Sequence, residues 1–144
     1  MHQQNASWQI TKPATTSTKG IVAAQSRVAA AVGADILSKG GNAVDAAIAT
    51  SFALGAAEPW MSGMGGGGYM VVQMADDPTP NVVEFGMHAP HGLRLEDYPI
   101  VGGKAGDLFP WPAVLEDRNV FGAKSVAVPG QVAGMGLALS LIHI

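Results

Sequence analysis

A glycine-rich segment constrains this chain more than any other feature of its sequence. Five of the seven residues from Ser62 to Gly68, SGMGGGG, are glycine. Glycine loses more backbone entropy on folding than any other residue, so a folded protein concentrates it only where the backbone needs unusual freedom or room. Three uses fit such a segment: a phosphate-binding loop, a flexible linker, or a connection at which two stretches of backbone meet closely.

The elements on either side of the glycines argue against phosphate binding. The glycines from Gly63 to Gly68 match the spacing G-x-G-x-x-G, but the dinucleotide motif has a strand before it and a helix after it. Here the alanine-rich segment 43–57 predicts a helix before the glycines, and the β-prone segment 69–75 predicts a strand after them. The residues after the last glycine are also not the Lys-Ser or Lys-Thr of a Walker loop. We therefore expect a helix-to-strand connection whose bare backbone approaches another segment or a substrate.

The helical signals lie in the first half of the chain. A helix beginning near Ser26 carries Val28, Val32 and Ile36 in one stripe, and the glycines at 40 and 41 end it. In the next helix Asn42 is the N-cap, and the acidic residue three positions later completes a pattern like a capping box. That second helix is apolar nearly all round, so we expect it to be buried on most sides.

The strand signals are shorter. They predict a buried strand over 20–26, a hairpin of 69–75 with 81–87, and a final strand before the Val-Pro-Gly turn at 128–130. A helix begins after that turn, and the region between 89 and 112 is rich in loops. The fold class is therefore α+β, with an irregular N-terminal arm over 1–18.

Composition indicates that other protein covers part of this surface. The sequence is 48% hydrophobic and 13% charged, whereas an average soluble domain has roughly 25% charged residues. The net charge of −3 gives no indication of a basic surface that would bind nucleic acid or an anionic membrane. The sequence has no cysteine for disulfides or metal binding. The apolar run 46–57 is too short to cross a bilayer and no signal peptide is seen, so we expect a cytoplasmic protein without a membrane segment.

Several motifs, taken in order, resemble one family. They are Gly-Asn-Ala-Val-Asp-Ala-Ala at 41–47, Glu-Pro at 58–59, the glycine segment 62–68, Glu-Phe with Ala-Pro within 84–90, and Pro-Gly-x-Val-Ala-Gly at 129–134. Together they resemble the start of a γ-glutamyltranspeptidase-type proenzyme. The resemblance runs over 19–138, while residues 139–144, LSLIHI, do not follow the family and suggest a non-native tail.

The resemblance implies an N-terminal-nucleophile (Ntn) hydrolase with an αββα sandwich, of which this chain holds only the N-terminal portion. Members cleave themselves before a threonine that then starts the small subunit and acts as the nucleophile. That threonine lies downstream, so we expect no catalytic residue in this chain and no activity from it alone. The implied partners are its own small subunit and a small-molecule amide substrate; no cofactor or metal is expected.

One departure bears on the substrate. The family has Asp-Phe-Arg-Glu-x-Ala-Pro where this chain has Glu84-Phe85-Gly86, and the arginine binds the α-carboxylate of the γ-glutamyl group. The resemblance therefore implies that Gly86, Met87 and His88 contact the substrate, with Gly86 in place of the arginine. Such a charge-assisted contact contributes on the order of 1.5–3 kcal/mol.

Two reactions and one other class stay open. One reaction is γ-glutamyl transfer or glutathione hydrolysis with another anchor, for which Arg27 and Arg94 are candidates. The other is hydrolysis of a different small amide, because several segments are similar to the oxamate amidohydrolase branch. A non-catalytic binding module is the alternative of another class. Trp60, Met61 and Met64 fit core packing better than a pocket lining, and His88 and His91 fit surface positions better than metal ligands.

Overall fold

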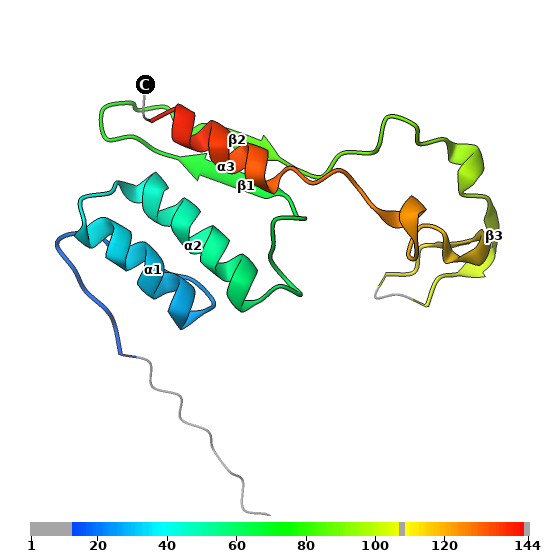
Figure 1. Ribbon diagram of the computed structural model, residues 1–144, viewed down its shortest axis with the longest axis horizontal. Coiled ribbons are helices and arrows are strands. Elements are labelled where there is room, and N and C mark those ends of the chain that lie inside the picture. The colour runs from blue at the N-terminus through cyan, green and yellow to red at the C-terminus, as the bar shows by residue number, and fades with distance from the viewer. Residues whose placement is uncertain (1–12, 107–108, 143–144) are drawn as a thin grey trace, which may run out of the picture.

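The computed structural model describes residues 13–106 and 109–142 of the chain. Its main body contains two helices, α1 (Arg27–Ser38) and α2 (Ala43–Ala57), a hairpin of β1 (Gly68–Val72) and β2 (Asn81–Phe85), and helix α3 (Gln131–Ser140). A smaller lobe lies between β2 and α3 in sequence and to one side in space (Figure 1). The prediction of a mixed α and β chain is confirmed, and the order of helix, glycines and strand is as expected.

The caps that the sequence predicts fix the ends of both N-terminal helices. Ser26 caps α1, and at its other end Gly40 takes φ +91° while the amide of Gly41 donates to the carbonyl of Ile36 over 3.0 Å. At the start of α2 the Asn42 side chain accepts from the backbone, and the Asp45 carboxylate accepts from the Asn42 amide over 2.9 Å. Both boundaries therefore follow from local chemistry.

Helices α1 and α2 pack through small residues. Ala29 and Gly33 are the buried residues of α1, and a Cβ at Gly33 would overlap Thr50 Oγ1 and lie 3.0 Å from the carbonyl oxygen of Ala46. The stripe that carries Val28 and Val32 points away, with Val28 68% exposed. The small residues thus permit the close approach of the two backbones, while Val28 and Val32 of α1 stay exposed.

The core lies where α2, the hairpin and α3 meet. β1 and β2 are antiparallel with Met70 opposite Val83, which puts Val83 and Phe85 on the inner face. Seven buried residues form the core cluster: Val44, Ile48, Val72, Val83, Phe85, Met135 and Ala138. Helix α2 is less buried than we expected, because only four of its residues are buried and Phe52 is 41% exposed.

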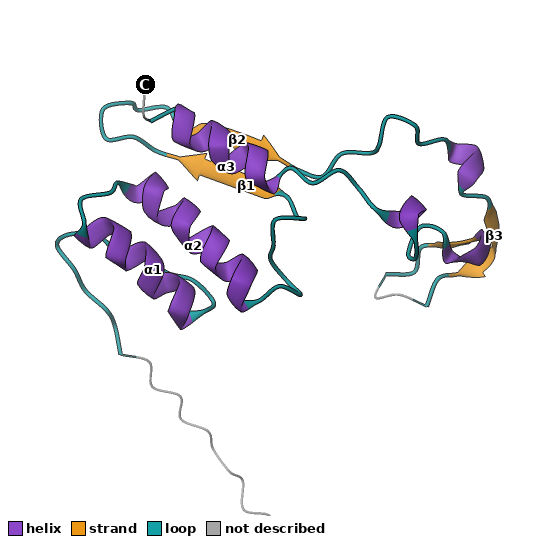
Figure 2. Ribbon diagram, viewed as in Figure 1, coloured by secondary structure: helices purple, strands orange, loops and turns teal. Residues whose placement is uncertain are grey.

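The lobe holds a second short pair of strands, β3 (Ile100–Lys104) with β4 (Pro112–Val114), which the sequence did not predict. Three short 3-10 turns accompany it, η1 (Leu95–Asp97), η2 (Leu115–Asp117) and η3 (Ala123–Ser125) (Figure 2). Two extended segments join the lobe to the body, and His88 and Val128 bridge them with paired backbone hydrogen bonds of 3.0 and 2.8 Å.

Two strand predictions are wrong. Residues 20–26 form no strand and have no strand partner among the described residues, and they lie against α1 and α2 instead. The segment before the Val-Pro-Gly turn forms only the single bridge at Val128. A strand needs a neighbour to take its hydrogen bonds, and neither segment has a second ladder position in the described part of the chain.

The predicted arm and tail lie partly outside the described residues, at 1–12 and 143–144. Residues 13–18 have no helix or strand, whereas α3 continues through Ser140 and Leu139 and Ile142 pack against the core. Among the described residues, none of the helices has the length and apolarity that crossing a membrane would require.

Candidate functional site

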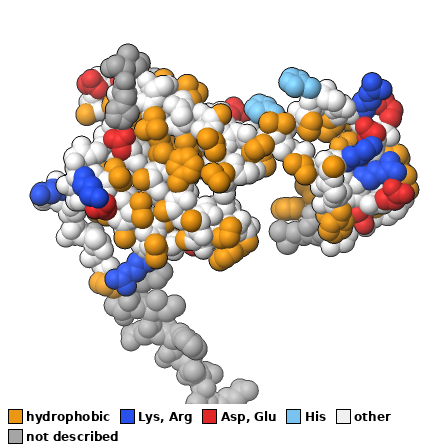
Figure 3. Space-filling view, viewed as in Figure 1, with side chains coloured by type: hydrophobic (Ala, Val, Ile, Leu, Met, Phe, Trp, Pro, Cys, Tyr) orange, Lys and Arg blue, Asp and Glu red, His pale blue; other side chains and the backbone are white. Residues whose placement is uncertain are grey.

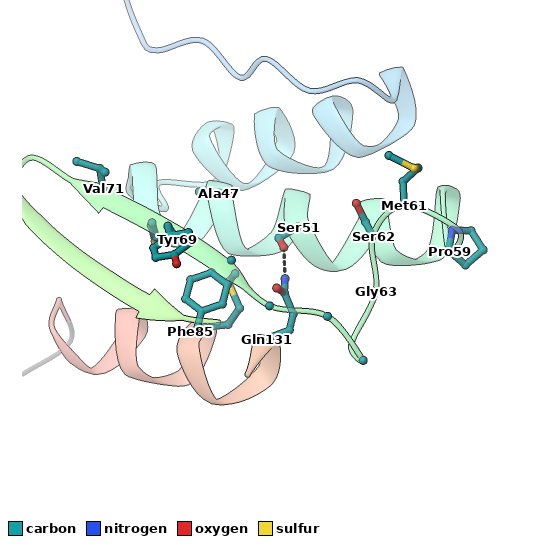
Figure 4. A pocket seen from close by; sticks show the side chains of 16 residues that line it. Ala47, Ser51, Pro59, Met61, Ser62, Gly63, Tyr69, Val71, Phe85 and Gln131 are labelled. Carbon is teal, nitrogen blue, oxygen red and sulfur yellow. Dashed lines mark hydrogen bonds between the residues drawn. The ribbon is translucent and has the colours of Figure 1, made fainter. Parts of the chain in front are cut away.

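A pocket of about 710 Å³ opens along the glycine segment, between α2, β1 and α3 (Figure 4). Part of its wall is bare main chain, because four consecutive glycines, Gly65 to Gly68, line it. Side chains with polar atoms come from three places: Ser51 on α2, Ser62 and Tyr69 on either side of the glycines, and Gln131 on α3. Phe85 and Met135 supply an apolar floor that continues into the core.

A hydrogen bond between two side chains closes one wall of this pocket. The Nε2 of Gln131 donates to the Oγ of Ser51 over 2.6 Å, joining residues that lie 80 positions apart (Figure 4). Gln131 is the first residue of α3, and Ser51 lies in the middle of α2. The bond therefore ties the start of α3 to α2 beside the glycine segment.

The glycine segment also contacts α3 through its own backbone. The carbonyl oxygen of Gly66 accepts from the amides of Gly130 and Gln131, over 3.1 and 3.0 Å. In a phosphate-binding motif, the first amides of the helix are directed at the anion. Here the loop's own carbonyl occupies them, which agrees with the argument against a phosphate loop made from element order.

The prediction that another segment approaches the glycine segment closely is confirmed at Gly67, and two glycines at the start of α3 make similarly close approaches. A Cβ at Gly67 would lie 2.6 Å from the carbonyl oxygen of Phe85, and one at Gly130 would lie 2.7 Å from that of Gly86. A Cβ at Gly134 would overlap the Cβ and Cγ of Phe85. Real Cβ atoms essentially never approach other heavy atoms this closely, so these positions require glycine in this arrangement.

The three residues predicted to contact substrate follow directly after the pocket residue Phe85. Gly86 is half-buried, Met87 is 59% exposed, and His88 is exposed with its backbone held by the bridge to Val128. None of the three lines the pocket itself. A Cβ at Gly86 would have no atom within 4 Å, so the absence of a side chain there is not imposed by packing.

The other residues considered from the sequence have different surroundings. Trp60, Met61 and Met64 are 76%, 72% and 68% exposed, so the expectation of core packing is wrong, and Met61 lines the pocket. Neither Arg27 nor Arg94 lines it. The histidines at 88 and 91 are exposed as predicted, and the described residues hold no cluster of three His, Cys, Asp or Glu suited to a metal.

Ser51 and Gln131 are the pocket residues that sequence reasoning missed. Ser51 was visible as one of few hydroxyl side chains in an otherwise apolar helix. Gln131 stands inside the Pro-Gly-x-Val-Ala-Gly motif, at the variable position, and so carried no signal of its own. Only the fold brings these two side chains together.

Comparison with known proteins identifies the family. The family model described as Gamma-glutamyltranspeptidase matches residues 29–141 of the chain. The chain belongs to the γ-glutamyltranspeptidase family. This confirms the resemblance drawn from the motifs.

Similar proteins include several named γ-glutamyltranspeptidase-family enzymes. The glutathione hydrolase proenzyme of Bacillus subtilis subsp. natto is 38% identical over 120 residues, 83% of this chain and 19% of the relative. The acylase ACY 1 proenzyme of Pseudomonas sp. strain V22 is 42% identical over 130 residues, 90% of this chain and 22% of the relative. The chain thus spans about a fifth of the length of these relatives.

Solved γ-glutamyltranspeptidases share the fold of this chain. The enzyme from Pseudomonas nitroreducens, complexed with L-DON, superposes with a TM-score of 0.72 at 35% identity, over 88% of this chain and 35% of that one. The enzyme from Helicobacter pylori superposes with a TM-score of 0.72 at 28% identity, over 90% of this chain and 34% of that one. The α+β arrangement described above is therefore one that γ-glutamyltranspeptidases contain.

Proposed function

We propose that this chain forms the N-terminal part of the large subunit of an amide-cleaving proenzyme of the γ-glutamyltranspeptidase family. At the family level, the reaction is γ-glutamyl transfer or hydrolysis of glutathione. The family match over 29–141 and the names of the relatives, glutathione hydrolase proenzyme and acylase proenzyme, support this proposal. The share of the relatives that the chain spans supports its place as one part of a longer protein.

The proposed chemistry follows the N-terminal-nucleophile scheme. A threonine freed by self-cleavage attacks the amide carbonyl while its own amine takes the proton. Backbone amides stabilise the oxyanion of the tetrahedral intermediate. In this proposal the nucleophile belongs to the small subunit, and the present chain supplies part of the substrate-binding surface. The chain alone is then inactive.

A feature of the hairpin supports a covering partner. The outer face of β1 and β2 carries Tyr69, Val71 and Val82, which are 70%, 69% and 63% exposed. Apolar side chains also dominate the centre of the face shown in Figure 3, whereas the charged residues gather at its edge and on the lobe. A two-stranded sheet is marginal alone, so we propose that the small subunit completes an αββα sandwich over this hairpin.

The observation that carries the site proposal is the position of the segment after β2. Phe85 lines the pocket, and Gly86 follows it, where the resemblance implies the position of the family's carboxylate-binding arginine. We propose that Gly86, Met87 and His88 lie against the substrate in the assembled enzyme. Met87 and His88 are exposed in this chain and available for such a contact.

The test is to express the complete reading frame that contains this chain. We expect self-cleavage into two subunits, seen as two bands on a denaturing gel with a new N-terminal threonine. The matured enzyme should release p-nitroaniline from γ-glutamyl-p-nitroanilide or cleave another small amide, while the 144-residue chain does neither. A complete protein that neither cleaves itself nor hydrolyses any tested amide would refute the enzyme proposal and favour a binding module.

A second candidate function is hydrolysis of a different amide, such as oxamate. The observation that favours it is the glycine at position 86, which offers no charge for the α-carboxylate of a γ-glutamyl group. A relative at 42% identity is named an acylase, which supports a proposal that includes acyl amides other than γ-glutamyl compounds. Parallel assays on oxamate and γ-glutamyl-p-nitroanilide distinguish the two candidate reactions. Robust γ-glutamyl transfer with ordinary affinity would refute the proposal of an amidohydrolase.

A further inference from the structure

Three glycines from separate parts of the sequence converge on one dipeptide. Gly67 precedes β1, Gly130 precedes α3, and Gly134 lies one turn into α3, yet all three pack against Phe85–Gly86. We refer to Gly67, Gly130 and Gly134 as the glycine clamp. Gly67 contacts the end of β2 from the glycine segment, and Gly130 and Gly134 contact it from the start of α3.

Gly67 and Gly130 contact main chain, and Gly134 contacts the side chain of Phe85 from its Cβ outward. A change of side-chain rotamer moves neither the main chain nor Cβ, so it cannot relieve a substitution at these positions. A Cβ at Gly67 would lie 3.0 Å from both the Gly86 carbonyl carbon and the Met87 nitrogen. A Cβ at Gly130 would lie 2.8 Å from the Phe85 carbonyl carbon. At Gly134 the Phe85 Cβ itself lies in the way, so no smaller side chain at 85 except glycine would make room.

The dipeptide that the clamp holds leads into the proposed substrate segment. Position 86 starts that segment, and two residues later the bridge between His88 and Val128 fixes the backbone again. The segment 86–88 is therefore set at one end by the clamp and at the other by two hydrogen bonds. Any displacement of Phe85–Gly86 therefore changes the position of the 86–88 segment.

We infer that Gly67, Gly130 and Gly134 are positioning residues that set the location of the 86–88 segment against the substrate. The inference rests on the proposed function, because it requires that this segment contacts the substrate. A positioning group displaced by about 1 Å costs on the order of 100-fold in rate. An alanine in the clamp should therefore lower kcat/KM of the matured enzyme by about 10- to 100-fold without preventing self-cleavage.

The competing explanation is that the clamp matters only for folding. Under that explanation a clamp variant yields less matured enzyme, but each matured molecule keeps the wild-type KM and kcat. Kinetic constants normalised to the amount of matured enzyme separate the two explanations. A positioning role also predicts a changed ratio of kcat/KM between two amides that differ at the end bound by 86–88.

The experiment compares Gly67→Ala, Gly130→Ala and Gly134→Ala with Gly136→Ala in the complete proenzyme. Gly136 lies on the same helix as Gly134, but a Cβ there meets nothing within 4 Å, so it controls for the change of glycine to alanine in α3. Self-cleavage and the thermal unfolding midpoint are measured first, then KM and kcat on the amide that the wild type hydrolyses best and on a second amide. The expected result is a loss of kcat/KM in matured clamp variants and a change within twofold for Gly136→Ala.

Each other outcome has a defined meaning. Matured clamp variants with wild-type constants overturn the inference, and so does a failure of all three variants to mature, because the clamp would then serve folding alone. If only Gly134→Ala fails to mature, the kinetic constants of Gly67→Ala decide between the two explanations, because its Cβ makes less severe contacts than that of Gly134→Ala. A wild-type proenzyme without amidase activity refutes the proposed function instead, and that result is seen before any variant is made.

Discussion

Restoring an arginine at position 86 tests the substrate proposal most directly. The structure offers room for it, because a Cβ at Gly86 has no atom within 4 Å. Gly86 is also absent from the glycines with positive φ, so an L-amino acid fits its backbone without strain. We therefore expect Gly86→Arg to fold and mature like the wild type in the complete proenzyme.

The size of the expected gain follows from the chemistry of the contact. A guanidinium can form a bidentate pair with the α-carboxylate of a γ-glutamyl group. A hydrogen bond to a charged group contributes about 1.5–3 kcal/mol. Because each 1.4 kcal/mol is tenfold, kcat/KM for γ-glutamyl-p-nitroanilide should rise by roughly 10- to 150-fold. The rise should come mainly through a lower KM.

Two controls isolate the carboxylate contact. Gly86→Met adds a side chain without a charge at the same place and should give no gain. Gly102→Arg adds the same charge on the lobe, at another glycine whose Cβ would meet nothing within 4 Å. A matured Gly86→Arg enzyme whose γ-glutamyl kcat/KM stays within twofold of wild type would refute the assignment of position 86 to the anchor.

Three further predictions concern stability and titration in the complete enzyme. Ser51→Ala removes the acceptor of the bond between α2 and α3 and should lower the free energy of unfolding by about 1 kcal/mol, measured by denaturant titration. Gly33→Ala pushes α1 away from α2 and should lower the free energy of unfolding by about 1–3 kcal/mol. By the same measurement, Gly136→Ala should be neutral or stabilising. The hydrogen bond from Lys124 holds the pKa of Asp97 below its ordinary value of 3.8, so the pair stabilises the lobe above that value and is lost as the pH falls through the lowered pKa. Lys124→Gln should raise this pKa in an NMR titration, and an unchanged value would contradict the pairing.

The helix boundaries and the hairpin could be predicted because local chemistry determines them. Asn42 and Asp45 satisfy the first amides of α2, and Gly40 adopts the left-handed conformation that ends α1. These effects act within four residues, so the sequence contains everything needed to foresee them. The family resemblance succeeded for a different reason: its motifs are long, several and in order.

The strand errors arose where structure depends on a distant partner. Residues 20–26 have the composition of a buried strand, but none of the strands among the described residues pairs with them. The reverse holds for β3 and β4, whose sequences are short and rich in glycine and proline, yet they pair with each other across the lobe. Whether two segments pair is not determined by the local sequence pattern of either one alone.

The candidate site shows the same division between local and remote effects. The glycine segment could be predicted as a place of close backbone approach, but the sequence did not say what approaches. The answer, Phe85–Gly86, lies 18 or more residues away from Gly67 and 44 or more from Gly130 along the chain. The two glycine-containing motifs, one before β1 and one at α3, thus serve one contact. The glycines of both motifs are explained by their contact with Phe85–Gly86 at the end of β2. For this reason we expect a substitution within the clamp to affect the substrate segment and not the pocket wall alone.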